Sequence, residues 1–170
     1  MSPGEWKTAR VRPANHPIAR LLVAAAFLAE HPEGLTGALL ESTRHADLAP
    51  AFLVEITAKH GASLGIDRAT IIMANAILPF ALAVSEHASD PELSEGAMRL
   101  WDALPASAHN RVTKAAQMQV GGSTALKGLG ERGMQGLIHL NRTLCTPRRC
   151  YECPVAALVV NDSAAPNAPG

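Results

Sequence analysis

The chain has 170 residues, which is enough for one globular domain with a core of ordinary size. Hydrophobic residues make up 48% of it and aromatic residues only 4%, so an intrinsically disordered chain is excluded and an aliphatic, helical core is favoured. The formal net charge of zero argues against a dedicated, non-specific nucleic-acid-binding protein.

The first segment, residues 1–16, is predicted to be an extended, basic lead-in. Two prolines four positions apart, at 13 and 17, disfavour a helix there. The segment carries Arg10, Arg12 and Asn15, whose side chains are well suited to hold phosphate or carboxylate groups. We predict that these three residues contact either the folded body of the protein or a polyanion.

The first helix is predicted to begin at Pro17, because proline suits the first turn of a helix. Its apolar stripe consists of Ile18, Leu21, Leu22, Ala25 and Leu28. The apolar run 21–29 follows arginines, as in a signal peptide, but it lacks the small-residue cleavage pattern and is too short to span a membrane. We therefore predict a core helix, a cytoplasmic protein and no membrane association.

The longest apolar segment, 68–87, is predicted to be a central, buried helix, because it is apolar nearly all round. Asp67 is a suitable N-cap for it. Pro79 lies within the segment and cannot donate a hydrogen bond to the carbonyl of Asn75. Asn75 either satisfies backbone groups at the resulting kink or makes a buried polar contact to a ligand or to the cysteine-rich end of the chain.

Shorter helices are predicted on both sides of the central one. Two precede it, over 35–40 and about 48–60. Three follow it: one capped by Asp90 and ended by Pro105, one capped by Ser107 and ended by Gly121, and a last helix over 131–144. No convincing strand pattern is present. The sequence thus predicts an all-α protein, with one compact multi-helix domain over 17–160 that ends in a cysteine-rich turn, and a disordered tail over 161–170.

All three cysteines lie near the C-terminus, at Cys145, Cys150 and Cys153, with the spacing C-x4-C-x2-C. A C-x2-C pair directs two sulfurs toward one point, and thiolates bind soft metal ions. The spacing matches the first three ligands of a plant-type two-iron cluster, although a fourth cysteine is absent. Three interpretations stay open: a zinc or iron–sulfur site, reduced structural or redox thiols, and one disulfide with a spare thiol.

A zinc or iron–sulfur site needs a fourth ligand, and His139 is one candidate for it. A more distant histidine, a solvent or substrate molecule and another chain are the others. His139 precedes Cys145 by six residues, so the two point apart on an unbroken helix. Both can be ligands only if the helix ends near Leu144 and the chain folds back, for which Pro147 provides a turn.

The cysteine-rich stretch is also basic, since it carries Arg142, Arg148 and Arg149. Arginines beside a thiol lower its pKa, which suits metal binding and redox chemistry alike. Guanidinium groups also bind phosphate well. We therefore predict that these arginines, like those of the lead-in, bind a polyanion.

Five phrases of the sequence, taken in order, resemble a known family. They are Arg10–Asn15, Ile71–Phe80, Leu100–Pro105 with Asn110, Gln135–His139 and Cys145–Pro154. Together they resemble the C-terminal half of the uncharacterised bacterial family called domain of unknown function 2851, over roughly residues 10–155. The resemblance implies that the three cysteines recur in the family and that Asn75, Asn110 and Gln135 lie in its recurring phrases. We predict these three as buried polar residues.

Family members are normally longer, with a strand-rich, nuclease-like N-terminal half, so the resemblance implies that this chain is the C-terminal part of a longer protein. One interpretation is a binding module that holds zinc or an iron–sulfur cluster and acts in nucleic-acid metabolism, with nucleic acid and a missing N-terminal domain as partners. The alternative is a structural or protein-interaction domain with reduced thiols and no metal. No general base, nucleophile pair or phosphate cradle stands out, which leaves enzymatic activity undecided.

Overall fold

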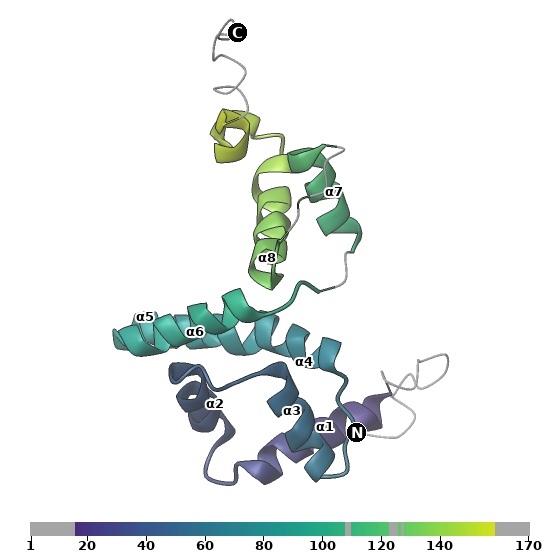
Figure 1. Ribbon diagram of the computed structural model, residues 1–170, viewed down its shortest axis with the longest axis vertical. Helices are drawn as coiled ribbons and strands as arrows, with labels where there is room; N and C mark the ends of the chain where they lie inside the picture. The colour runs from purple at the N-terminus through teal and green to yellow at the C-terminus, as the bar shows by residue number, and fades with distance from the viewer. Residues whose placement is uncertain (1–15, 108–109, 123–125, 127, 159–170) are drawn as a thin grey trace, which may run out of the picture. The chain divides into compact units, whose positions relative to one another are not determined.

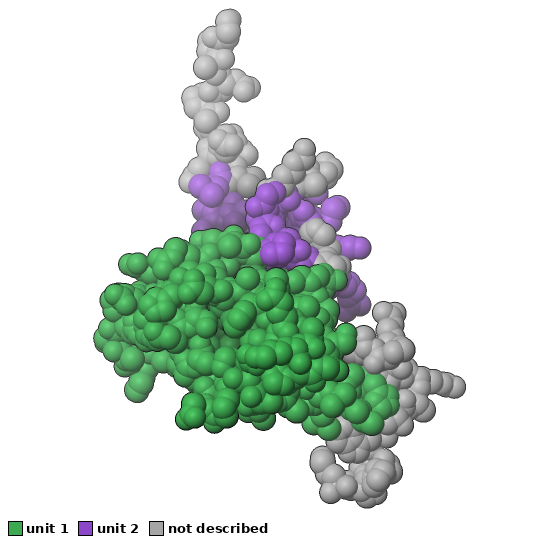
Figure 2. Space-filling model, turned by 60° about the horizontal axis from the view of Figure 1, so that its bottom comes forward, with its two compact units in different colours: residues 1–104 green, residues 105–170 purple. Residues whose placement is uncertain are grey.

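The computed structural model describes residues 16–107, 110–122, 126 and 128–158 (Figure 1). Every regular element among these residues is a helix, which confirms the predicted all-α fold class. The chain forms two compact units, Met1–Leu104 and Pro105–Gly170 (Figure 2). The division falls inside the range predicted as one helical domain. The described residues do not include the tail over 161–170 or the lead-in, apart from its last residue. The predictions for Arg10, Arg12 and Asn15 therefore lie outside the described residues.

Unit 1 opens with three helices, α1 (Pro17–Glu30), α2 (Leu35–Arg44) and α3 (Pro50–Lys59). Prolines occupy the first turn of α1 and of α3, as expected for a residue that has no N–H to leave unsatisfied. Helix α2 extends four residues beyond its predicted end, because tertiary contacts with α6 support its last turn. Thr43 in that turn is fully buried and donates its hydroxyl to the carbonyl of Leu39 at 2.7 Å.

The central helix is continuous over 23 residues, as α4 (Ile66–Ile72), a π-helical turn (Met73–Ile77) and α5 (Leu78–Ala88). It begins after Gly65, so Asp67 lies in the first turn and is not the N-cap. The π turn ends two residues before Pro79. A proline has no N–H for the carbonyl four residues back, and a wider turn accommodates this local break in the hydrogen-bond ladder.

The central helix is buried on one face only. Met73, Leu78 and Ala81 are fully buried in the core of unit 1, whereas Ile71 and Phe80 on the outer face are 47% and 50% exposed. The expectation of burial all round was therefore wrong, although the helix does form the centre of the core. Among the described residues, it is the one helix whose length and apolarity (mean hydropathy 1.6) would allow it to cross a membrane. The core helix of a soluble protein can have the same length and apolarity.

Asn75 lies on the outer face and is exposed, so the prediction of a buried polar residue was wrong at this position. The reason is its spacing, four residues after exposed Ile71 and therefore on the same side of the helix. Its side-chain amide donates to the carbonyl of Ile71 at 3.0 Å. This bond matches the simpler prediction, in which Asn75 satisfies a backbone group near the proline.

Helix α6 (Pro91–Ala103) packs against α5 and α2, and Figure 1 shows α5 and α6 side by side. Asp90 caps α6 as predicted, accepting from the backbone N–H of Leu93 at 3.0 Å. The carboxylate of Asp90 also accepts from the Arg44 guanidinium at 2.7 Å, which ties the start of α6 to the end of α2. This hydrogen bond, followed by that from Leu93, holds the pKa of Asp90 below its usual range.

We predict a small acid-sensitive contribution from Asp90 to the stability of unit 1. Because its pKa is lowered in the folded state, the contribution is present at neutral pH and is lost as the pH falls through the lowered value. Asp90→Asn keeps a good N-cap but removes the charge. The variant should melt slightly lower than the parent near neutrality, and the difference should shrink in acid. Thermal melts over a pH series would test this, and a difference that grows in acid would contradict it.

Unit 2 contains α7 (Arg111–Gly121) and α8 (Glu131–Leu140), which pack through Ala116, Met134 and Leu137. Asn110 caps α7, accepting from the N–H groups of Val112 and Thr113 at 2.8 and 3.0 Å, whereas Ser107 had been predicted as the cap. A capping side chain points at the helix end rather than into a core. Asn110 is accordingly exposed, and its prediction as a buried residue was also wrong.

Candidate functional site

The three cysteines lie where α8 ends. Helix α8 continues without a break through a π-helical turn, Asn141–Cys145, so Cys145 is the last residue of the helical rod. The chain then turns at residues 146–148, as expected around Pro147, with Arg148 in a left-handed conformation (φ 59°). A short 3₁₀ helix, Cys150–Glu152, follows, and Cys153 comes directly after it. The turn thus returns the last two cysteines toward the first.

All three cysteines line one pocket, of about 440 Å³, together with side chains from α7 and from residues after the turn. The other lining residues are mostly aliphatic: Gln119, Val120, Leu140, Leu144, Arg148, Val155 and Ala156. Cys153 is buried, Cys145 is half-buried and Cys150 is exposed, and all three are free thiols in the structure. The three cysteine side chains therefore share one pocket.

The thiol of Cys145 has a raised pKa. Its burial is the main cause, and the negative charges that Cys153 and Cys150 would carry raise the pKa further. The neighbouring arginines were expected to lower thiol pKa values, and for Cys145 this expectation was wrong. One reason is that Arg149 directs its guanidinium at Glu152, donating from Nε to Oε1 at 3.1 Å and forming an ion pair with the same carboxylate.

His139 does not join the cysteines. It is exposed on α8 and does not line the thiol pocket, because the helix runs on past Leu144 and carries Cys145 to a different side. Among the described residues, no three His, Cys, Asp or Glu side chains form a group arranged to hold a metal ion. The three thiols therefore line one pocket but are not arranged as the ligands of a metal ion.

Of the arginines predicted to bind a polyanion, Arg148 lines the thiol pocket, while Arg142 and Arg149 are exposed nearby in the chain. The pairing of Arg149 with Glu152 lowers the pKa of that glutamate and offsets the positive charge of the arginine. Among the described arginines that were predicted to bind a polyanion, Arg148 is thus the one that lines the pocket with the three cysteines.

Glu131 is a buried carboxylate that was not predicted from the sequence. It is 1% exposed at the start of α8 and accepts from the backbone N–H of Ser107 at 2.7 Å. Gln135, half-buried one turn later, donates its amide to the other carboxylate oxygen at 3.0 Å. The four-residue spacing of Glu131 and Gln135 was the available signal, since such pairs share one face of a helix. Together they anchor the segment that enters unit 2.

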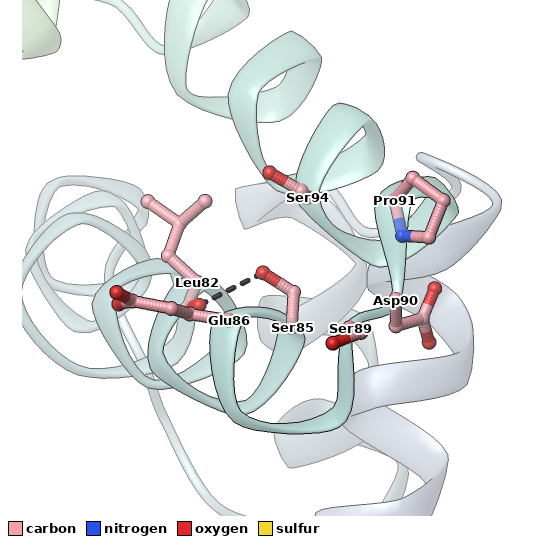
Figure 3. Close-up of a pocket in the computed structure, with 7 residues that line it drawn as sticks. All are labelled: Leu82, Ser85, Glu86, Ser89, Asp90, Pro91 and Ser94. Carbon is pink, nitrogen blue, oxygen red and sulfur yellow. Dashed lines mark hydrogen bonds between the residues drawn. The ribbon is translucent and has the colours of Figure 1, made fainter.

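A second hollow, of about 650 Å³, lies at the turn between α5 and α6 (Figure 3). Its lining is rich in hydroxyl and carboxylate groups, from Ser85, Glu86, Ser89, Asp90 and Ser94. Ser85 donates its hydroxyl to the carbonyl of Leu82 at 2.8 Å, the dashed line in Figure 3, and Asp90 caps α6 and pairs with Arg44. Ser85 and Asp90 therefore have structural roles where α5 meets α6.

The protein is therefore an all-α protein of two helical units, with a thiol-lined pocket in the second. It belongs to the family described as protein of unknown function (DUF2851), whose model matches residues 1–110. The matched range contains unit 1 and three of the phrases that carried the resemblance, but it ends before the cysteines. No curated protein and no solved structure matches the chain.

Proposed function

We propose that unit 2 is a metal-binding module, in which Cys145, Cys150 and Cys153 hold a thiophilic ion such as Zn²⁺, or an iron–sulfur cluster. The observation that carries the proposal is that three thiols from separate positions in the chain line one small pocket. Soft thiolate ligands select zinc and iron–sulfur clusters over hard cations.

The electrostatics of the pocket favour a bound cation. Burial and the neighbouring sulfurs oppose ionisation of Cys145, so three thiolates would repel one another if nothing neutralised them. A divalent metal removes this repulsion and displaces the thiol protons. Arg148, at the same pocket, contributes only one positive charge.

Binding would require the thiols to close around the ion. Zinc–sulfur bonds are about 2.3 Å long, and the three sulfurs would reach this distance through changes in side-chain rotamers and in the turn after Cys145. Exposed Cys150, on a single 3₁₀ turn, has the most freedom to move. Solvent or a partner molecule would supply the fourth ligand, since His139 lies elsewhere.

The test is metal analysis of anaerobically purified protein, with cysteine variants. Binding at a hundredfold excess of metal over Kd would stabilise the folded unit by about 2.7 kcal/mol. We predict that Cys153→Ser loses the bound metal and lowers the melting temperature together. His139→Ala, the matched control, should retain both. Zinc by elemental analysis or visible absorbance from a cluster would support the proposal; metal-free protein with unchanged stability in the serine variant would contradict it and favour a domain with plain reduced thiols.

Nucleic acid is the partner we propose for this module, because guanidinium groups recognise phosphate and Arg148 lies at the thiol pocket. Replacing Arg142 and Arg148 together should weaken binding to a nucleic acid and flatten its dependence on salt, while leaving the fold intact. Fluorescence anisotropy with a labelled duplex over a salt series measures this. A binding curve identical to that of the parent at every salt concentration would remove nucleic acid as a partner of these arginines.

A further inference from the structure

Helix α1 has two apolar faces, and only one of them is used by unit 1. On the inner face Ala26 is buried, and Val23 and Phe27 pack against the core. The stripe predicted to face the core is instead the outer face: Ile18, Leu21, Leu22 and Leu28 are 59%, 55%, 53% and 60% exposed, and Ala25 and Ala29 are exposed beside them. We call these six residues the α1 stripe.

The α1 stripe is continuous and carries no charge. At about 100° per residue, its six members fall within an arc of about 120° on the helix. Arg20 and Glu30, the charged residues of α1, lie outside this arc, and Glu30 accepts hydrogen bonds from Lys59 (2.7 Å) and His60 (2.8 Å) on the α3 side. Aliphatic residues recurring at positions 18, 21, 25 and 28 have the three-and-four spacing of a helix that packs against another helix.

We propose that the α1 stripe docks against the same stripe of a second copy of the chain, with the two helices antiparallel. In the register that sets residue 18 against residue 28 of the other copy, residue 21 lies against Ala25. The large Leu21 then meets a small alanine at both central positions, and Ile18 meets Leu28 at both ends. A parallel pair would instead set Ala25 against Ala25 and leave a gap, so the stripe is complementary to itself in one direction only.

A second copy suits this surface better than a polar or charged partner. The stripe offers no donor, acceptor or charge that would recognise such a partner, whereas two-fold pairing requires only that one patch fits itself. Helix α1 has 14 residues and is about 21 Å long, so the interface is at the small end of specific interfaces, below about 1,200 Å² in total. We therefore expect a reversible dimer that dissociates in the micromolar range. This inference is independent of the thiol pocket.

The test is sedimentation velocity of the whole chain from low to high micromolar concentration, with two variants designed for the antiparallel register. Ile18→Glu and Leu28→Lys each place a charge that suits its end of the helix, so neither should lower the melting temperature. Each variant alone should be monomeric at concentrations where the parent dimerises. An equal mixture should regain the dimer, because the introduced glutamate of one copy then faces the introduced lysine of the other.

The control is Phe80→Glu, which adds a charge to a half-exposed apolar residue on another face of unit 1 and should leave the dimer unchanged. A parent chain that stays monomeric at high micromolar concentration would overturn the proposal and leave the stripe to a different occupant. A dimer that survives both α1 variants but is lost with Phe80→Glu would place the interface on the central helix instead. Failure of the mixture to regain the dimer would exclude the antiparallel register.

Discussion

Gly96→Ala is expected to destabilise unit 1 by about 3 kcal/mol, at the upper end of the usual cost of overpacking a core. A Cβ atom at position 96 would lie 2.1 Å from the backbone oxygen of Thr43 and 2.6 Å from that of Arg44. Both are main-chain atoms at the end of α2, and the neighbouring Thr43 side chain is fully buried. A clash with backbone cannot be relieved by a rotamer change, so α6 and α2 would have to separate.

Gly37→Ala is the matched control, because it makes the same change in α2 where the new Cβ would meet nothing within 4 Å. There the substitution should raise stability by about 0.5–1 kcal/mol, through the better helix propensity of alanine. Urea unfolding followed by tryptophan fluorescence measures both variants, since Trp101 packs against the core of unit 1. If Gly96→Ala unfolds at the same urea concentration as the parent, then α2 and α6 do not approach as closely as the structure shows.

Glu131→Ala is expected to destabilise unit 2 by about 1–3 kcal/mol, the cost of leaving buried hydrogen-bonding groups unsatisfied. The change removes the acceptor for the Ser107 N–H and for the Gln135 amide, and it leaves a void at a position that is 1% exposed. Hydrogen exchange of the α8 amides measures the effect within unit 2 itself. Protection of these amides should fall, while protection in α5 and α6 should not change.

Glu131→Gln separates the charge of this residue from its hydrogen bonds. Glutamine retains an oxygen that can accept from Ser107, and Gln135 can reverse its own amide to accept from the new NH₂ group. This variant should therefore keep most of the protection that Glu131→Ala loses. Equal loss in both variants would mean that the negative charge, rather than the hydrogen bonds, stabilises the start of α8.

The residue that begins each helix shows how much of the fold could be predicted. Pro17 and Asp90 mark the starts of α1 and α6 correctly, because capping depends on a few neighbouring residues. Cap prediction went wrong at Asp67 and Ser107, where Gly65 and Asn110 are the caps. Ser107 instead takes part in a tertiary contact, since it donates its backbone N–H to Glu131, which is 24 residues away in the chain.

Part of the candidate site could also be predicted, because a turn depends on a few neighbouring residues. The spacing of Cys145, Cys150 and Cys153, with a proline between the first two, indicated a candidate thiol site and a turn, and the structure places the three side chains at one pocket. Their surroundings were not predictable. The walls of the pocket come partly from α7, and the raised pKa of Cys145 follows from its own burial and from the other two sulfurs.

The sequence by itself determined the all-α class, the helix order and the turn between Cys145 and Cys150, because helical periodicity, caps and turns are properties of short stretches of chain. The tertiary structure alone decided which apolar faces are covered. The α1 stripe and the outer face of the central helix have the composition of a core and yet are exposed, while Glu131 is charged and yet is buried. Burial depends on which other element packs against a face, and no local pattern contains that information.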